Sequence, residues 1–145
     1  MIADWNKSRE EKSAGLGHQT NGIRVWCKPP DGWIKINSDA ACIPGASQVD
    51  VGCIARDDCG RFLRAKTAVL QGQFQPREAE AIGLREALSW IMPWRKTKCI
   101  FECDAKMVVD AVNGGSGNSY FHMIIDDCKD IIKHFDEVLV GLRII

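Results

Sequence analysis

The segment from residue 76 to residue 91 constrains the possible fold more than any other part of the sequence. Pro76 suits the first turn of a helix, because proline lacks the N–H group that this turn leaves unpaired. Apolar side chains then recur at helical spacing as far as Ile91, and Pro93 ends the helix. Strand patterns lie on both sides, and a helix that joins two strands of one sheet makes them parallel. The sequence therefore predicts an α/β fold.

Three strand patterns precede this helix and are joined by short connections. Residues 33–41 alternate between apolar and polar side chains, as a half-buried strand does. Residues 51–56 and 61–70 give a second and a third pattern. The Asp-Asp-Cys-Gly turn at residues 57–60 between them is typical of a hairpin, because its glycine adopts a positive φ readily. The three strands are therefore predicted to form an antiparallel meander.

The remaining sequence adds two strands and two helices. Residues 97–103 indicate a buried strand, residues 105–112 a short helix, residues 119–135 an amphipathic helix and residues 137–145 a final strand. The element order is β-β-β-α-β-α-α-β. We predict a five-stranded mixed sheet with the spatial order 3-2-1-4-5, antiparallel in strands 1-2-3, with helices packed on its faces.

Composition is that of one globular domain. The chain has 145 residues, of which 46% are hydrophobic and 26% charged. No apolar run approaches the roughly 20 residues of a membrane helix, and residues 1–20 lack the apolar stretch of a secretory signal. We interpret residues 1–25 as a flexible leader and residues 26–145 as the folded domain. The expectation is a monomeric intracellular protein of the nucleus or cytoplasm.

Charge and cysteine content restrict the chemistry further. Basic and acidic residues number 19 each, so the net charge is zero and a strongly basic nucleic-acid binder is not indicated. Any contact with phosphate must then come from a local cluster or from metal ions. No cysteine pair has the spacing of a zinc site. We interpret the seven cysteines as reduced and mainly as core residues, with a redox or metal role as the alternative.

Glu80 is the most informative acidic residue. It precedes Leu84 and Leu88 by four and eight positions, so it lies on the helix stripe that faces the core. A buried carboxylate needs cations or hydrogen bonds. The alternative is that Glu80 interacts with the helix dipole, the role that we assign to Glu78 on a more mixed face.

Two further acids lie at strand ends. Asp39 shares its face of the first strand with Lys35 and Asn37, which is unusually polar for a central strand, although Asp39 could also be a turn residue. Asp104 ends the fourth strand and could be the N-cap of the next helix. The predicted sheet places the first and fourth strands side by side with the helix across them. The carboxylates of Asp39, Glu80 and Asp104 are therefore expected to converge.

Converging carboxylates repel one another unless cations lie between them. Ligands that are all oxygen favour Mg²⁺ or Mn²⁺. Two such ions about 4 Å apart activate water and stabilise the leaving oxygen of a phosphodiester. We expect no basic side chain between the three acids.

Four motifs occur in order along residues 26–145. They are residues 26–41, residues 52–60, Ala79-Glu80-Ala81 and Phe101-Glu102-Cys103-Asp104. Together they resemble the type 1 ribonuclease H-like domain of the plant non-LTR retrotransposon and reverse-transcriptase-like family. The resemblance implies metal-dependent endonucleolytic hydrolysis of the RNA strand of RNA–DNA hybrids, which leaves a 3′-hydroxyl. It implies that Asp39, Glu80 and Asp104 are the catalytic residues and the ligands of a two-ion Mg²⁺ or Mn²⁺ site.

The sequence also departs from that family. The family's domain continues beyond the fifth strand into a helix with a fourth acidic residue, so we expect a truncated final helix and weakened cleavage. Ala40 and Ala105 stand where the family usually has glycine and often has serine. The alternative function is a catalytically silent nucleic-acid- or protein-binding domain derived from a retrotransposon. The neutral charge favours it and the three acids disfavour it. A thiol redox protein has only the cysteine count in its favour.

Overall fold

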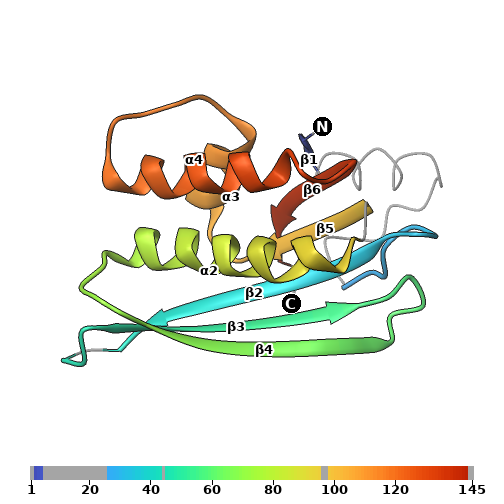
Figure 1. Ribbon diagram of the computed structural model, residues 1–145, viewed down its shortest axis with the longest axis horizontal. Coiled ribbons are helices and arrows are strands. Elements are labelled where there is room, and N and C mark those ends of the chain that lie inside the picture. The colour runs from blue at the N-terminus through green and yellow to red at the C-terminus, as the bar shows by residue number, and fades with distance from the viewer. Residues whose placement is uncertain (1, 5–25, 44, 96–97, 144–145) are drawn as a thin grey trace, which may run out of the picture.

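The computed structural model describes residues 2–4, 26–43, 45–95 and 98–143, and one mixed sheet runs through it (Figure 1). Its described strands are β1 (Ile2–Asp4), β2 (Ile34–Cys42), β3 (Gln48–Arg56), β4 (Phe62–Gln71), β5 (Lys98–Cys103) and β6 (Glu137–Leu142). The described helices are α2 (Pro76–Ile91), the 3₁₀ turn η1 (Met92–Trp94), α3 (Lys106–Asn113) and α4 (Tyr120–Ile132).

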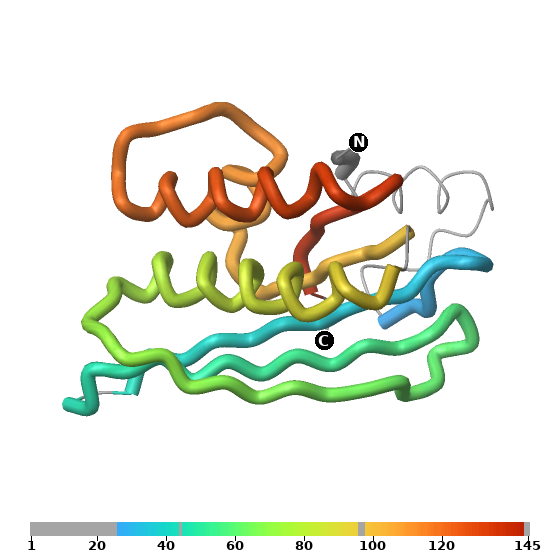
Figure 2. The backbone as a smooth tube through the Cα atoms, viewed as in Figure 1, coloured from blue at the N-terminus to red at the C-terminus, as the bar shows by residue number. Residues whose placement is uncertain are grey.

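The sheet has the order β1-β6-β5-β2-β3-β4. Strands β2, β3 and β4 are antiparallel neighbours, whereas β2 with β5 and β5 with β6 are parallel. Figure 2 follows the chain from this meander through α2 into β5. The predicted order of five strands, 3-2-1-4-5, is confirmed as β4-β3-β2-β5-β6.

The strand β1 is an addition that the sequence did not suggest. Residues 2–4 pair with β6 in parallel, with Ile2 opposite Val138. The interpretation of residues 1–25 as a flexible leader therefore does not hold for Ile2–Asp4. The outer edge of β6 offers unpaired backbone groups, and a three-residue segment is enough to pair with them. Residues 1 and 5–25 lie outside the described part of the chain.

Helix α2 has the predicted bounds, and Glu78, which was expected to interact with the helix dipole, also caps its start. The Gln75 N–H donates to Glu78 Oε1 at 2.9 Å, so Glu78 supports the first turn. Pro93 was predicted to end the helix, but helical turns continue past Ile91 for a further three residues. Pro93 lies in η1, which ends at Arg95 with a φ of 56°. Helix α4 is shorter than predicted, because Ser119 is its N-cap and the helix ends at Ile132.

The core lies between the sheet and the helices. The α-helices of the described residues lie on one side of the sheet, with α2 on β2 and α4 packed against α2 (Figure 1). Four cysteines are buried, and burial raises the pKa of Cys53 and Cys103 to about 11 and that of Cys128 to about 12. These three thiols are protonated at neutral pH, which supports their interpretation as core residues. The four buried cysteines are Cys53, Cys99, Cys103 and Cys128.

A buried ion pair lies on the polar face of β2. Lys35 Nζ is 3.1 Å from Glu102 Oε1 in β5, and both side chains are 0% exposed. Lys35 also donates to the Cys27 carbonyl oxygen at 2.6 Å and lies 4.6 Å from the centre of the Trp26 ring. The Asn37 amide donates to the same Glu102 oxygen at 3.4 Å. The contacts of Lys35 and Asn37 with Glu102 join β2 to β5 close to the last paired residues, Asn37 and Glu102.

Candidate active site

The three acids singled out in the sequence lie together. Asp39, Glu80 and Asp104 each offer a carboxylate oxygen, and these oxygens lie within 4.8 Å of one another. Asp39 and Asp104 are exposed, and Glu80 is half-buried. The predicted convergence of the three carboxylates is therefore what the fold produces. We call Asp39, Glu80 and Asp104 the acidic cluster.

The parallel pairing of β2 and β5 brings two of the acids to one edge. The last paired residues of these strands are Asn37 and Glu102. Asp39 and Asp104 each lie two residues beyond them in the sequence. Parallel strands end at the same edge of a sheet. The two carboxylates thus lie just beyond the point where β2 and β5 cease to pair.

Gly83 brings the third acid to the same place. A Cβ atom at Gly83 would lie 3.2 Å from Ala40 Cβ and 3.8 Å from the Asp39 carbonyl oxygen. Glycine therefore lets α2 lie closely against the end of β2, and Glu80, one turn earlier, reaches Asp39. Glycine inside a helix costs about 1 kcal/mol relative to alanine. A glycine inside a helical pattern is thus a sequence signal of close packing, and it could have strengthened the prediction that Glu80 meets Asp39.

Electrostatics of the acidic cluster are unfavourable without a cation. Burial raises the pKa of Glu80 to about 7, and the negative charges of Asp104 and Asp39 contribute to that shift. The Arg143 guanidinium opposes the shift. Glu80 thus binds a proton more readily at neutral pH than an ordinary glutamate does. A cation placed among the carboxylates would favour the ionised form of Glu80.

The structure excludes the alternative roles of the two aspartates. The N-cap of α3 is Ala105, so Asp104 does not cap that helix. Asp39 lies inside β2 and pairs with Gly52 of β3, so it is not a turn residue after the strand. Its Oδ1 accepts a hydrogen bond of 3.0 Å from the Ala40 N–H. Neither a helix cap nor a turn therefore explains the position of these carboxylates.

We expected no basic side chain between the three acids, and the structure places one basic side chain in contact with one of them. Arg143 Nη2 is 3.4 Å from Asp104 Oδ2. Arg143 directly follows β6, which is parallel to β5, so the ends of β5 and β6 meet at the edge that carries Asp104. The predicted strand order already implied this neighbourhood, and it is the signal by which Arg143 could have been found.

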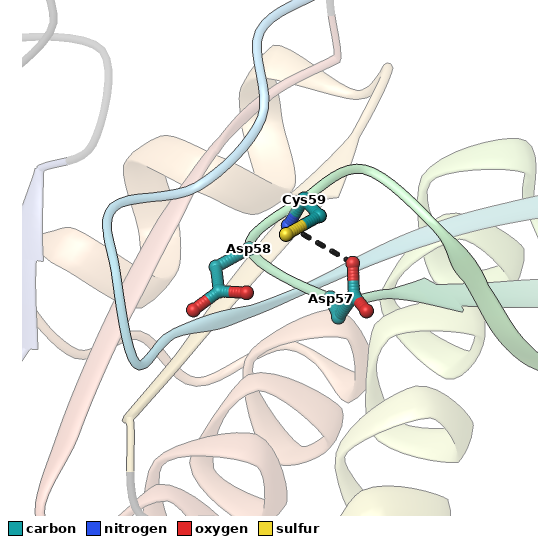
Figure 3. A group of neighbouring side chains, drawn as sticks. All are labelled: Asp57, Asp58 and Cys59. Carbon is teal, nitrogen blue, oxygen red and sulfur yellow. Dashed lines mark hydrogen bonds between the residues drawn. The ribbon is translucent and has the colours of Figure 1, made fainter.

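A second group of potential ligands lies in the hairpin between β3 and β4 (Figure 3). Asp57, Asp58 and Cys59 also have ligand atoms within 4.8 Å of one another. Asp57 Oδ1 accepts hydrogen bonds from the N–H groups of Cys59 and Arg61 at 2.9 and 2.8 Å. Hydrogen bonding from the Arg61 backbone holds the pKa of Asp57 below its ordinary value. The group stabilises the turn, and we call it the hairpin group.

Comparison with known proteins places the chain in a family. The sequence profile of the reverse transcriptase-like family matches residues 37–143, which include the acidic cluster and Arg143. The chain belongs to this family. No curated protein matches the chain.

Solved structures show the same fold. Ribonuclease H1 of the halophilic archaeon Halobacterium salinarum has a TM-score of 0.69 at 14% identity, over 77% of this chain and 85% of that one. The N-terminal ribonuclease H domain of a Mycobacterium tuberculosis protein has 0.67 at 14% identity, over 77% and 86%. LC11 ribonuclease H1, isolated from compost and solved with an RNA/DNA hybrid, has 0.64 at 16% identity, over 74% and 83%. The family member therefore has a ribonuclease H fold.

The helices also bear on membrane insertion. Within the described ranges, none of the helices combines the length and the apolar character needed to cross a membrane.

Proposed function

We propose that this reverse transcriptase-like protein is a metal-dependent nuclease that hydrolyses the RNA strand of RNA–DNA hybrids. The observation that carries the proposal is the convergence of Asp39, Glu80 and Asp104 within 4.8 Å on a ribonuclease H fold. One neighbour of the same fold was solved with an RNA/DNA hybrid, which supports this substrate class.

The acidic cluster fits a divalent cation. Its donor atoms are all carboxylate oxygens, which favour Mg²⁺ or Mn²⁺ over softer metals. Burial, and after it the negative charges of Asp104 and Asp39, raise the pKa of Glu80, so a cation at this place would stabilise its ionised form. Asp39, Glu80 and Asp104 would hold the metal in a two-ion site. Bound ions at such a site supply a nucleophilic water and stabilise the leaving oxygen of a phosphodiester.

The chain's own contribution is a rigid arrangement of ligands. Asp39 is fixed by the pairing of β2 with β3, and Asp104 follows directly after β5. Glu80 lies in the first part of α2, and its raised pKa of about 7 lets a proton compete with a cation near neutral pH. Binding of a cation requires that this proton leave. Ligands carried on strands and helices are held more accurately than ligands on loops.

A second function has one observation in its favour. Arg143 supplies a positive charge to the acidic cluster without any metal. That contact suits a catalytically silent domain that binds nucleic acid or a protein partner. The same domain would then bind hybrids without cleaving them.

Cleavage of a labelled hybrid distinguishes the two functions. The full chain is incubated with an RNA–DNA hybrid labelled on the RNA, with Mg²⁺ or Mn²⁺, and with the same RNA as a single strand and as an RNA duplex. We expect metal-dependent cleavage of the hybrid alone, with 3′-hydroxyl products. Asp104→Asn should abolish cleavage, whereas the matched variant Asp110→Asn, on the exposed face of α3, should retain it. Hybrid binding without cleavage at any metal concentration would favour the silent domain.

A further inference from the structure

Arg143 is held beside the acidic cluster by its backbone. Its N–H donates to the Cys103 carbonyl oxygen at 2.7 Å, immediately after the last paired residues of β5 and β6, Cys103 and Leu142. Asp104 is the residue that follows Cys103. The position of Arg143 is therefore set by the sheet, and its side chain starts next to the carboxylate that it contacts.

The contact with Asp104 is not that of an optimised structural ion pair. Strong arginine–carboxylate pairs are bidentate, with distances of about 2.7–2.9 Å. Here the Arg143 Nη2 atom donates to Asp104 Oδ2 at 3.4 Å. The Nε atom is buried and has no hydrogen-bond partner within the described part of the chain. A buried donor left unpaired is unfavourable. Attraction to the whole acidic cluster explains this position better than a bond to Asp104 alone.

The charges of the site limit what else it can hold. The acidic cluster carries three negative charges when ionised, and Arg143 contributes one positive charge. The remaining two negative charges are balanced by one divalent cation. A second divalent cation would leave an excess of two positive charges while Arg143 stays, and of one if Arg143 moves away, which a substrate phosphate could then balance.

We propose that Arg143 is a built-in counter-ion of the acidic cluster, which competes with divalent cations and limits the substrate-free site to one of them. This inference rests on the proposed function, because it assumes that the acidic cluster binds metal. It makes Arg143 a residue that determines the metal occupancy of the acidic cluster.

Titration of the metal-free full chain with Mn²⁺ tests the inference. Free Mn²⁺ is measured by electron paramagnetic resonance for the wild type, Arg143→Gln and the matched control Lys106→Gln. Lys106 lies two residues from Asp104, but its Nζ pairs with Asp110 at 2.6 Å. We expect one bound ion in the wild type and in Lys106→Gln. Arg143→Gln should bind roughly tenfold more tightly and should take a second ion, because one nearby positive charge is lost.

Each other result has a defined meaning. An affinity of Arg143→Gln within about twofold of the wild type would overturn the inference and leave the proposed function intact. The same would follow from two ions in the wild type, or from an equal gain in Lys106→Gln. Absence of Mn²⁺ binding in both the wild type and Arg143→Gln would overturn the proposed function itself. Arg143→Lys, which keeps the charge, should keep the affinity of the wild type.

A measurement on the wild type keeps the test decisive if Arg143→Gln does not fold. The Nε–H resonance of Arg143 is assigned in the nuclear magnetic resonance spectrum by its loss in Arg143→Lys. We expect this resonance to shift during a Mg²⁺ titration with the same midpoint as the Asp104 amide. An Nε–H resonance that stays fixed while the Asp104 amide moves would show that the metal does not displace the guanidinium.

Discussion

The acidic cluster and the hairpin group look alike when only the distances between their ligand atoms are considered. In both, three potential ligands lie within 4.8 Å of one another. They differ in what surrounds the carboxylates. Backbone N–H groups bind Asp57, and Asp58 Oδ2 accepts a further hydrogen bond of 2.8 Å from the Gly32 N–H. Glu80 is half-buried beside two other acids, and burial raises its pKa to about 7.

The direction of a pKa shift therefore distinguishes a structural carboxylate from a candidate ligand. The protein stabilises the charge of Asp57, and that charge in turn stabilises a turn. At Glu80 the protein destabilises the negative charge, so a bound cation would stabilise the ionised carboxylate there. Proximity of acidic side chains alone would have assigned two metal sites to the described residues.

The largest expected effect is on cleavage. Asp39→Asn should lower the rate of hybrid cleavage at least about hundredfold, because a lost ligand removes several kcal/mol of charge stabilisation at the reacting phosphate. Asp58→Asn in the hairpin group should leave the rate within about twofold. The initial rate on a labelled hybrid measures both variants. A comparable loss of rate in Asp58→Asn would contradict the assignment of cleavage to the acidic cluster alone.

The second effect is stabilisation by metal. Mn²⁺ at about a hundred times its Kd should stabilise the wild type by about 2.7 kcal/mol, because the ion binds the folded state. Asp57→Asn should show the same gain, and Asp104→Asn should lose most of it. Thermal unfolding with Mn²⁺ and with a chelator supplies the numbers. Undiminished stabilisation of Asp104→Asn would place the ion elsewhere.

The third effect is on the stability of the metal-free protein. Here the variant in the hairpin group should be affected more than the variant in the acidic cluster. Asp57→Ala should destabilise the protein, because two backbone N–H groups lose their acceptor. Asp39→Asn should cost little, since it relieves repulsion within the acidic cluster. Urea unfolding in the presence of a chelator compares the two. A loss above roughly 3 kcal/mol in Asp39→Asn, the scale of a broken buried ion pair, would make Asp39 structural.

The smallest effect is the pH dependence of metal-free stability, which should have opposite signs in the two groups. The pKa of Glu80 is raised from 4.5 to about 7, so its contribution is fully present below 4.5 and is lost as the pH rises through 7. The pKa of Asp57 is lowered from 3.8, so its contribution is present above 3.8 and is lost as the pH falls. Urea unfolding at about pH 5 and about pH 8 should show a decline in the wild type that Glu80→Gln reduces. An unchanged decline in Glu80→Gln would assign it to other groups.

Most of the sheet could be predicted because its signals are local. Alternation marks β2, a turn glycine with a φ of 80° marks the hairpin at Gly60, and Pro76 marks the start of α2. The order of the strands then follows from the rules for crossover connections. The strand β1 could not be predicted, because three residues are too short to show a period and their pairing with β6 spans most of the chain.

The three acids of the candidate site could be predicted from the sequence, whereas the contact of Arg143 with Asp104 was not predicted. Glu80 stood out because a carboxylate lay on an apolar stripe, and strand adjacency brought Asp39 and Asp104 to it. Arg143 is 39 residues from Asp104, and its contact depends on where β6 ends relative to β5. The predicted strand order indicates that the ends of β5 and β6 are neighbours, but the end of a strand is the least certain part of a sequence pattern, so the residue that lies beside Asp104 is identified by the folded structure. The metal-binding role of the three acids stays a prediction that cleavage and titration will test.

The buried pair of Lys35 and Glu102 gives the acidic cluster a fixed alignment. A slip of β2 by one residue against β5 would turn Asp39 to the opposite face of the sheet, because side chains alternate along a strand. The same slip would part Lys35 from Glu102 and leave two charges buried without each other, a change of about 3–5 kcal/mol. The pair thus helps to specify the register of β2 against β5, since the shifted register has a higher free energy than the native one. Anyone who transplants the three acids into another scaffold would need to transplant Lys35 and Glu102 with them.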